Sequence, residues 1–148
     1  MSRFVRPQTT VVPLTNGDTI TVKTRLSAGE QQEAYARMYH TGTDGKLHVN
    51  PLQSGRAMMT AYLVDWNLTD DDGAPVPIRG LTVEELDAVL GLLEPESFAE
   101  IKRAIDAHET RMVEARAAEK KTPAGSPLDA PISPSPSAPA GVSSGSVN

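Results

Sequence analysis

Hydrophobic and polar positions alternate most clearly near the start of the chain. Two runs rich in β-branched residues, 9–14 and 19–24, flank the tetrapeptide Thr15-Asn16-Gly17-Asp18. Asn-Gly accepts positive φ at both centres of a tight turn, so this pattern predicts a β-hairpin over residues 9–25. Pro13 lacks an amide hydrogen, so we expect its strand at a sheet edge or at a bulge. An isolated hairpin is only marginally stable, so other elements must cover its apolar face.

Helical spacing of apolar positions follows the hairpin. Ser27 with Glu30, and Thr82 with Glu85, have the spacing of capping boxes, which predicts helices over about 28–39 and 83–93. Prolines at 51 and 95 suit first helical turns and predict helices over about 52–65 and 95–120. The last two helices have apolar stripes formed by Val83, Leu86, Val89, Leu90 and Leu93, and by Phe98, Ile101, Ile105 and Met112.

Two segments are less clearly patterned. Residues 40–50 contain the turn signal Thr43-Asp44-Gly45-Lys46, so we expect a loop there. Residues 61–68 are apolar nearly all round, which suits either a buried helix or a switch to a strand. We favour the helix and keep the strand as the alternative.

The C-terminal residues 122–148 differ in composition from the rest. Six prolines recur every two to four residues, and Asp129 is the only charged residue. Proline interrupts both helices and strand ladders, and so few bulky apolar groups cannot offset the entropy of ordering, so we predict a disordered tail. The remaining residues 1–121 form one globular domain. The predicted fold class is α+β, mainly α, with an N-terminal β-hairpin packed on about four helices, the last of them long.

Composition excludes several classes of function. The chain has 148 residues, no cysteine and a net charge of -5, from 14 Lys and Arg against 19 Asp and Glu. Thiolate catalysis, disulfide scaffolds and Cys-ligated metals are therefore excluded. We expect no binding to nucleic acid, because phosphate neutralisation needs clustered cations. We also expect no membrane segment or secretory signal, because the N-terminal residues 1–7 carry arginines without an apolar stretch.

Residue patterns that could support chemistry are weak. His40 and His48 could meet across the loop and hold a metal, but solvated loop histidines are the simpler interpretation, and His108 suits a place in the packed stripe. Asp70-Asp71-Asp72-Gly73 resembles part of a calcium loop, yet Leu68 and Arg79 fall at the positions that need carboxylates. We therefore interpret it as a polar turn. No catalytic, cofactor-binding or metal-binding residues are assigned, and we expect a protein that is not an enzyme.

One segment, residues 62–78, resembles the small tail assembly chaperones of long-tailed bacteriophages. In that family a helix ending in tryptophan precedes an Asp-rich turn with glycine, an extended stretch with proline and then a capped helix. Residues at matching positions here are Trp66, Asp70, Asp72, Gly73, Pro75 and Pro77. The resemblance extends over about residues 55–110. We expect Trp66 to join the two halves of the domain by burying its indole, with the acidic turn facing water.

The resemblance implies binding to the tape measure protein. In that family the chaperone keeps the long apolar helices of the tape measure protein soluble until tail tube subunits assemble around it. It also implies recruitment of tail tube protein, a place in the host bacterial cytoplasm and absence from the mature virion. Self-association is kept open. A ribosomal frameshift near the end of the reading frame is common in the family. Here Glu119-Lys120-Lys121 precede the change in composition, so we expect a longer form if the codons are slippery.

Methionines are the candidate partner-binding residues, because their side chains adapt to varied apolar surfaces and suit capture of a helix in a groove. The candidates are Met38, Met58, Met59 and Met112. Ordinary core packing is the alternative for each.

Two further functions remain alternatives. The first is a structural virion protein, such as a neck, tail terminator or baseplate component. The second is a small adaptor whose proline-rich tail recruits a partner, since Pro131-Ile132-Ser133-Pro134 fits the P-x-x-P pattern.

Overall fold

The computed structural model of the chain describes residues 2–121. Contacts group residues 1–110 into one compact unit, and a second unit begins at Arg111. The described part of the second unit is the C-terminal stretch of one long helix, α4 (Pro95–Lys121). The predicted disordered tail, residues 122–148, lies outside the described residues, as does its P-x-x-P segment.

The first unit contains a three-stranded antiparallel sheet with the order β1-β2-β5. Its strands are β1 (Thr9–Pro13), β2 (Thr19–Lys23) and β5 (Leu63–Trp66). The turn between β1 and β2 holds a short 3-10 segment, η1 (Thr15–Gly17), in which Asn16 and Gly17 have φ of 61° and 79°. Positive φ at both positions is what the Asn-Gly pair predicts. Pro13 lies on the edge strand β1, where no neighbour needs its missing amide.

Three helices of this unit have the starts that the sequence predicts. These helices are α1 (Ala28–Met38), α2 (Pro51–Tyr62) and α3 (Val83–Leu90). Both capping boxes are formed, by Ser27 with Glu30 and by Thr82 with Glu85. Burial of the Glu30 carboxyl raises its pKa. Hydrogen bonds from the Lys23 ammonium and the Ser27 amide lower the pKa by more than burial raises it, so the pKa of Glu30 is below its usual value.

The prediction of a helix over residues 52–65 is wrong at its C-terminal end. Helix α2 ends at Tyr62, and Leu63–Trp66 form strand β5 beside β2. The register pairs Leu63 with Val22 and Trp66 with Ile20, with an irregularity between these pairs. This bulge lets Leu63 and Trp66 both reach the core although they are three residues apart, which hides the period of two that marks a strand.

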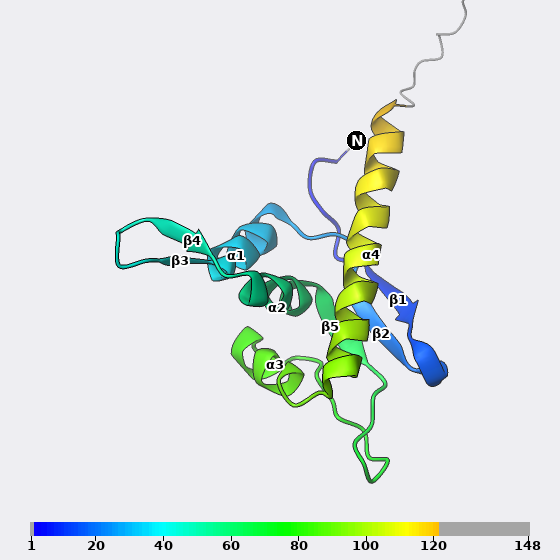
Figure 1. The fold of residues 1–148 in the computed structure, drawn as a ribbon. Helices are drawn as coiled ribbons and strands as arrows, with labels where there is room; N and C mark the ends of the chain where they lie inside the picture. The colour runs from blue at the N-terminus through cyan, green and yellow to red at the C-terminus, as the bar shows by residue number, and fades with distance from the viewer. Residues whose placement is uncertain (1, 122–148) are drawn as a thin grey trace, which may run out of the picture. The chain divides into compact units, whose positions relative to one another are not determined.

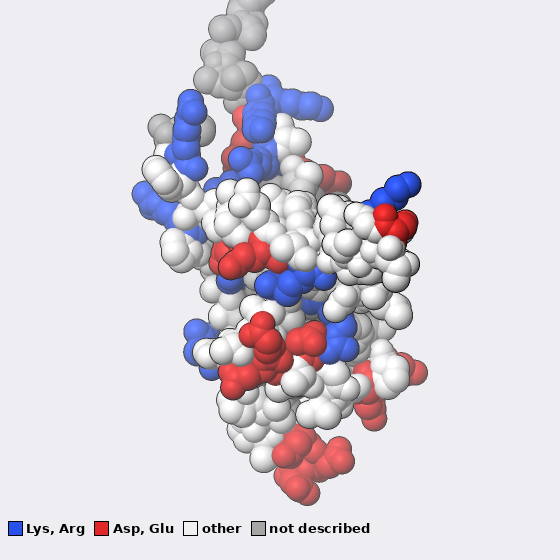
Figure 2. Space-filling model, turned by 90° about the vertical axis from the view of Figure 1, so that its left-hand side faces the viewer, with Lys and Arg blue, Asp and Glu red and all other residues white. Residues whose placement is uncertain are grey.

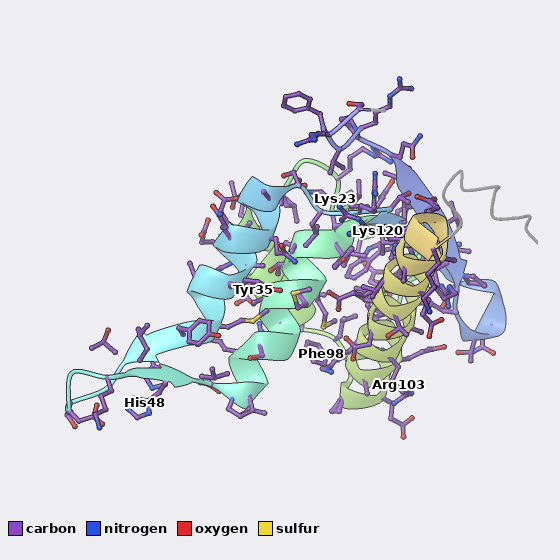
Figure 3. The ribbon with its side chains drawn as sticks, turned by 90° about the horizontal axis from the view of Figure 1, so that it is seen from above. Lys23, Tyr35, His48, Phe98, Arg103 and Lys120 are labelled. Atoms are coloured by element: carbon purple, nitrogen blue, oxygen red, sulfur yellow. The ribbon has the colours of Figure 1, made fainter. Side chains whose placement is uncertain are left out.

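The expected loop over residues 40–50 is a second β-hairpin. Strands β3 (Tyr39–Thr41) and β4 (Leu47–Val49) pair with each other and with no other strand of residues 2–121. All six strand residues are exposed, and the hairpin projects from the end of α1 and the start of α2, two helices that pack side by side (Figures 1 and 3). We call residues 39–49 the β3–β4 arm.

The core lies between the sheet and the helices. Its buried apolar side chains come from the inner face of the sheet, from α2, α3 and α4, and from Ile78. They are Val12, Ile20, Val22, Met59, Tyr62, Leu63, Trp66, Ile78, Leu86, Leu90, Ile101 and Ile105. Glu100 of α4 also accepts hydrogen bonds from the amide and hydroxyl of Thr15, at 2.8 and 3.1 Å, which fixes the β1–β2 turn to this helix. The architecture is therefore α+β and mainly α, as predicted.

Candidate functional site

Trp66 anchors the segment on which the family resemblance rests. It closes strand β5 and is 9% exposed. Its indole Nε1–H donates a hydrogen bond to the carbonyl oxygen of Val76 at 2.6 Å. The indole thus buries its apolar body while its polar edge finds a partner ten residues farther along. Trp66 ends a strand here and not a helix, which departs from the family pattern.

The residues between Trp66 and Val76 form a small hairpin closed by the acidic turn. The Asp70 N–H donates to the Ala74 carbonyl at 2.8 Å, and the Val76 N–H donates to the Leu68 carbonyl at 3.2 Å. Thr69 and Pro75 form an isolated bridge. In Figure 1 this segment is the green loop between β5 and α3, and we call residues 67–77 the acidic hairpin.

Asp70 organises the turn itself. One oxygen of its carboxylate accepts the amides of Asp72 and Ala74, at 2.9 and 3.0 Å. Gly73 has φ of 78°, a conformation that favours glycine. Asp71, Asp72 and Pro77 are exposed. Within residues 2–121 no group of three or more His, Asp or Glu side chains is placed to hold a metal ion.

Asp65 links the strand to the far end of this segment. Its carboxylate accepts the Trp66 amide at 2.9 Å and forms an ion pair with Arg79, with Nη2 and Oδ2 3.0 Å apart. Asn67 supports the other side by accepting the Thr19 amide at 2.8 Å. The candidate motif is therefore tied to β2 and to the segment that precedes α3 by side-chain contacts as well as by the core.

A groove of about 520 Å³ lies beside Trp66, between the acidic hairpin and the junction of α3 with α4. Leu92 stands at its edge with 86% of its surface exposed. We call this the Trp66 groove. Its apolar walls are Trp66, Leu68, Val76, Val89, Leu92 and Leu93. Its carboxylates are Asp18, Asp70, Asp71 and Glu94. Figure 2 is turned about the vertical axis of Figure 1, so heights agree between the two views. The red group at the bottom of Figure 2 lies at the height of the acidic hairpin in Figure 1.

The candidate methionines do not form one surface. Met59 is fully buried in the core, so its assignment as a partner-binding residue is corrected to core packing. Met58 packs against the same core and is partly buried. Met38 ends α1, and Met112 lies in the second unit, both with intermediate exposure. Met59 reaches the core because α2 packs against both α1 and α3 and turns this side chain into the buried cluster.

The β3–β4 arm brings His40 and His48 together, as the sequence allowed. Their rings stack with centroids 5.7 Å apart. His48 Nε2 lies 3.1 Å from the Asp44 carboxylate, and the Lys46 amide donates to the same oxygen. These two hydrogen bonds lower the pKa of Asp44, and the bond from the Lys46 amide has the larger effect. The opposite face of the arm carries exposed apolar side chains, Tyr39, Leu47 and Val49.

His108 is buried, in agreement with a place in the packed stripe. Its Nε2 donates to the carbonyl oxygens of Lys23 and Thr24, at 3.0 and 3.2 Å, while Nδ1 has no partner among the described residues. The ring centroids of His108 and Tyr62 lie 5.9 Å apart in an edge-on contact.

The neighbours of this contact have raised pKa values. Burial is the main cause that raises the pKa of Tyr62 to about 12, and the charges of Glu109 and Tyr35 add to it. Burial and the nearby Asp106 also raise the pKa of Glu109.

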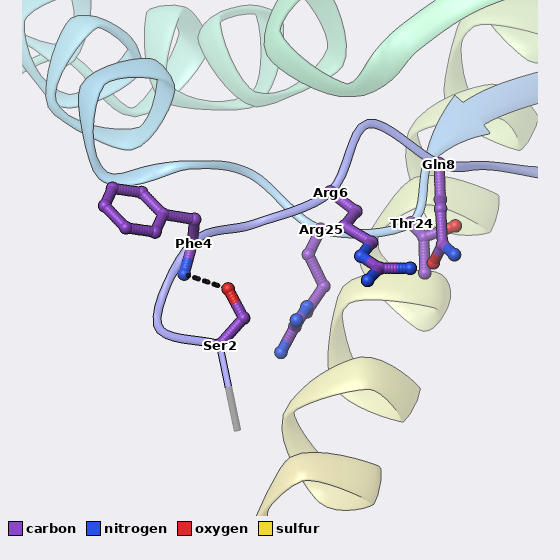
Figure 4. A pocket seen from close by; sticks show the side chains of 6 residues that line it. All are labelled: Ser2, Phe4, Arg6, Gln8, Thr24 and Arg25. Atoms are coloured by element: carbon purple, nitrogen blue, oxygen red, sulfur yellow. Dashed lines mark hydrogen bonds between the residues drawn. The ribbon is translucent and has the colours of Figure 1, made fainter.

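A smaller pocket of about 180 Å³ lies where the N-terminal segment crosses the end of β2 (Figure 4). Arg6 and Arg25 line it, and neither guanidinium has an ion-pair partner among the described residues. Phe4 is exposed, and its amide donates to the Ser2 hydroxyl at 3.2 Å. The pocket is open and polar, and no buried group points into it.

Sequence reasoning missed the Trp66 groove. The available signal was Leu92-Leu93 before Glu94-Pro95, because two adjacent leucines at a helix end cannot both face the same core. Comparison with protein-family models, curated proteins and solved structures found no match to this chain. In the described part of the chain, no helix is both long and apolar enough to cross a bilayer.

Proposed function

We propose that this protein is a bacteriophage tail assembly chaperone that binds the tape measure protein and helps to recruit tail tube subunits. In this proposal it acts by contact, without catalysis, in the cytoplasm of the bacterial host. Support comes from the segment that carries the resemblance, where Trp66, Asp70, Gly73 and Pro75 belong to one locally closed unit.

The observation that carries the proposal is the Trp66 groove. It places an exposed leucine and further apolar side chains beside the segment that resembles the family. Before the tail tube forms, the tape measure protein exposes apolar helical faces to water. A groove of this kind lowers the free energy of such a face by removing apolar surface from water.

Coexpression tests the proposal. The tape measure protein is produced alone, with the wild-type chain, or with a Leu92→Asp variant, and its soluble fraction is measured together with its retention on the tagged chain. We expect wild type to raise solubility and to retain the tape measure protein, and Leu92→Asp to reduce both. Leu52→Asp is the matched control, because Leu52 is 85% exposed outside the groove. Absence of retention in mild salt with wild type contradicts the proposed function.

A structural virion protein is the second candidate, and the β3–β4 arm is the observation that favours it. The arm offers exposed apolar side chains and two open strand edges, a combination that suits incorporation into a larger assembly. Mass spectrometry of purified particles separates the two functions. A chaperone is expected to be absent from finished virions, whereas a neck, terminator or baseplate component is present in fixed copy number.

The frameshifted longer form is tested by the nucleotide sequence. A slippery heptamer around the codons for Lys120 and Lys121 supports it. Absence of such a heptamer between codons 115 and 148 removes this part of the proposal and leaves the binding function unchanged.

A further inference from the structure

We propose that the Trp66 groove binds a positively charged amphipathic helix, with apolar side chains in the groove and Lys or Arg side chains against its acidic rim. This inference assigns the proposed function to one surface and to one kind of partner. It rests on the proposed function for the identity of the natural partner.

The apolar part of the groove is open to water. Leu92 is 86% exposed, whereas its neighbour Leu93 is partly buried against the core. Leu68 and Val76 on the acidic hairpin and Val89 on α3 are also only partly buried. These side chains come from two elements that face each other across the groove. An apolar side chain placed between them would remove surface from water on both sides.

The charge of the rim selects the partner. Asp18, Asp70, Asp71 and Glu94 line the groove, and none of its described lining residues is Lys or Arg. The carboxylates of Asp18, Asp71 and Glu94 make no hydrogen bond or ion pair within residues 2–121. They are therefore available to cations from a partner, and they disfavour an acidic helix or a phosphate group.

The backbone around the groove favours a helix over an added strand. In the acidic hairpin, the amides of Asp70 and Val76 already donate to Ala74 and Leu68. At the other wall, the amides of Leu92 and Leu93 donate to Val89 and Leu90. The groove therefore presents side chains and few free backbone groups. A helix meets such a surface with anchors at i, i+3, i+4 and i+7 and keeps both flanks for charged residues.

The chain contains a single tryptophan, and that residue lines the groove, so its fluorescence reports binding directly. The full chain is titrated with a synthetic amphipathic peptide of about 18 residues, roughly five helical turns, with leucine anchors and lysine flanks. A second peptide has glutamate in place of every lysine. We expect the lysine peptide to shift the Trp66 emission and to bind at least ~10-fold more tightly than the glutamate peptide, with an affinity that falls as salt rises.

Variants locate the binding. Leu92→Ser is expected to weaken the lysine peptide ~10-fold, whereas Leu52→Ser, equally exposed but on α2, leaves it unchanged. Asp71→Lys with Glu94→Lys is expected to abolish the preference between the two peptides, because the two new cations then balance the remaining carboxylates of Asp18 and Asp70. Glu33→Lys with Glu119→Lys changes the net charge equally at exposed sites away from the groove and is expected to preserve the preference.

The outcomes separate this inference from the proposed function. Equal affinity for both peptides, or no effect of Leu92→Ser on peptide binding, overturns the groove inference, even if wild type still retains the tape measure protein through another surface. If the lysine peptide binds as expected but the tape measure protein is not retained, the groove inference stands and the proposed function fails.

Discussion

Single side chains decide how the candidate segment is held, and Trp66 has the largest part. Its ring fills the core at the end of β5, and its one polar atom binds the carbonyl of Val76. A phenyl ring could occupy much of the same space but could not donate that hydrogen bond. Replacement of the indole by a phenyl ring therefore removes this hydrogen bond together with part of the packed ring.

Trp66→Phe is expected to lower the free energy of unfolding by about 1–3 kcal/mol, because the Val76 carbonyl is left without its donor and the smaller ring packs less well. Urea denaturation followed by circular dichroism measures it. Tyr35→Phe is the control, since its hydroxyl accepts an exposed hydrogen bond from Gln31, and we expect a change within about 0.5 kcal/mol. Equal stability of Trp66→Phe and wild type would show that the bond to Val76 contributes nothing.

Glu109 gives the molecule a pH dependence whose sign follows from its surroundings. Burial and Asp106 raise its pKa, so the folded state binds its proton more tightly than the unfolded state does. Stability contributed by this group therefore falls as pH rises from about 4.5 through the raised pKa, and the loss is complete above it.

Glu109→Gln is expected to raise Tm by roughly 1–4 °C at pH 7, a modest effect because the carboxyl is only partly buried and solvent still screens its charge. At pH 3.5, where the carboxyl is mostly protonated in both states, the difference from wild type is expected to shrink. Thermal unfolding at the two pH values measures it, with Glu114→Gln on α4 as the exposed control. A larger gain in acid than at neutral pH would contradict the assigned sign.

At the level of secondary-structure elements, local sequence signals predicted where helices begin, whereas contacts with distant parts of the chain determine where α2 ends. The capping boxes at Ser27 and Thr82 act within four residues, so the sequence alone locates the starts of α1 and α3. The switch from α2 to β5 depends on pairing with β2, about 40 residues earlier in the chain, and on a bulge that sends Leu63 and Trp66 to the same side. Neither can be inferred from the composition of residues 61–68.

The β3–β4 arm escaped prediction for a different reason. Its strands have only three residues each and, in the described part of the chain, pair only with each other, so neither length nor burial marks them. Gly45 has φ of 78° in the turn, which is the one local feature that the sequence did indicate. Such an arm has little tertiary support, which leads to a prediction about its local stability.

Amide hydrogens of His40 and His48 are expected to exchange at least ~100-fold faster than those of Ile20 and Val22, because the arm opens without exposing the core, whereas β2 is buried in the sheet. Hydrogen exchange measured by NMR or mass spectrometry checks this ratio. Protection of the arm equal to that of β2 would contradict the prediction and show that another chain covers it in solution.

For the whole molecule, the Trp66 groove is assembled from three separate parts of the sequence. Asp18 follows the β1–β2 turn, residues 66–76 supply strand β5 and the acidic hairpin, and residues 89–97 supply the α3–α4 junction. The sequence marked Trp66 and the acidic turn as a unit, but it could not show that Leu92 would stand opposite them. The groove is therefore formed only when the chain folds. Its negative charge comes from carboxylates that the fold brings to the rim without a cationic partner among the described residues.

This arrangement distinguishes the proposed chaperone function from that of an adaptor that recruits partners through its proline-rich tail. Every described residue that lines the groove lies between 18 and 97, so a chain ending at Lys121 keeps all of them. We expect that chain to retain the tape measure protein within about 3-fold of the full-length affinity, a difference of less than 1 kcal/mol. Calorimetric titration measures both chains, and Leu92→Asp in the shortened chain is expected to reduce its binding as in the full one. If removal of residues 122–148 abolishes binding while the circular dichroism spectrum still shows the folded domain, recognition resides in the tail and the adaptor becomes the better function.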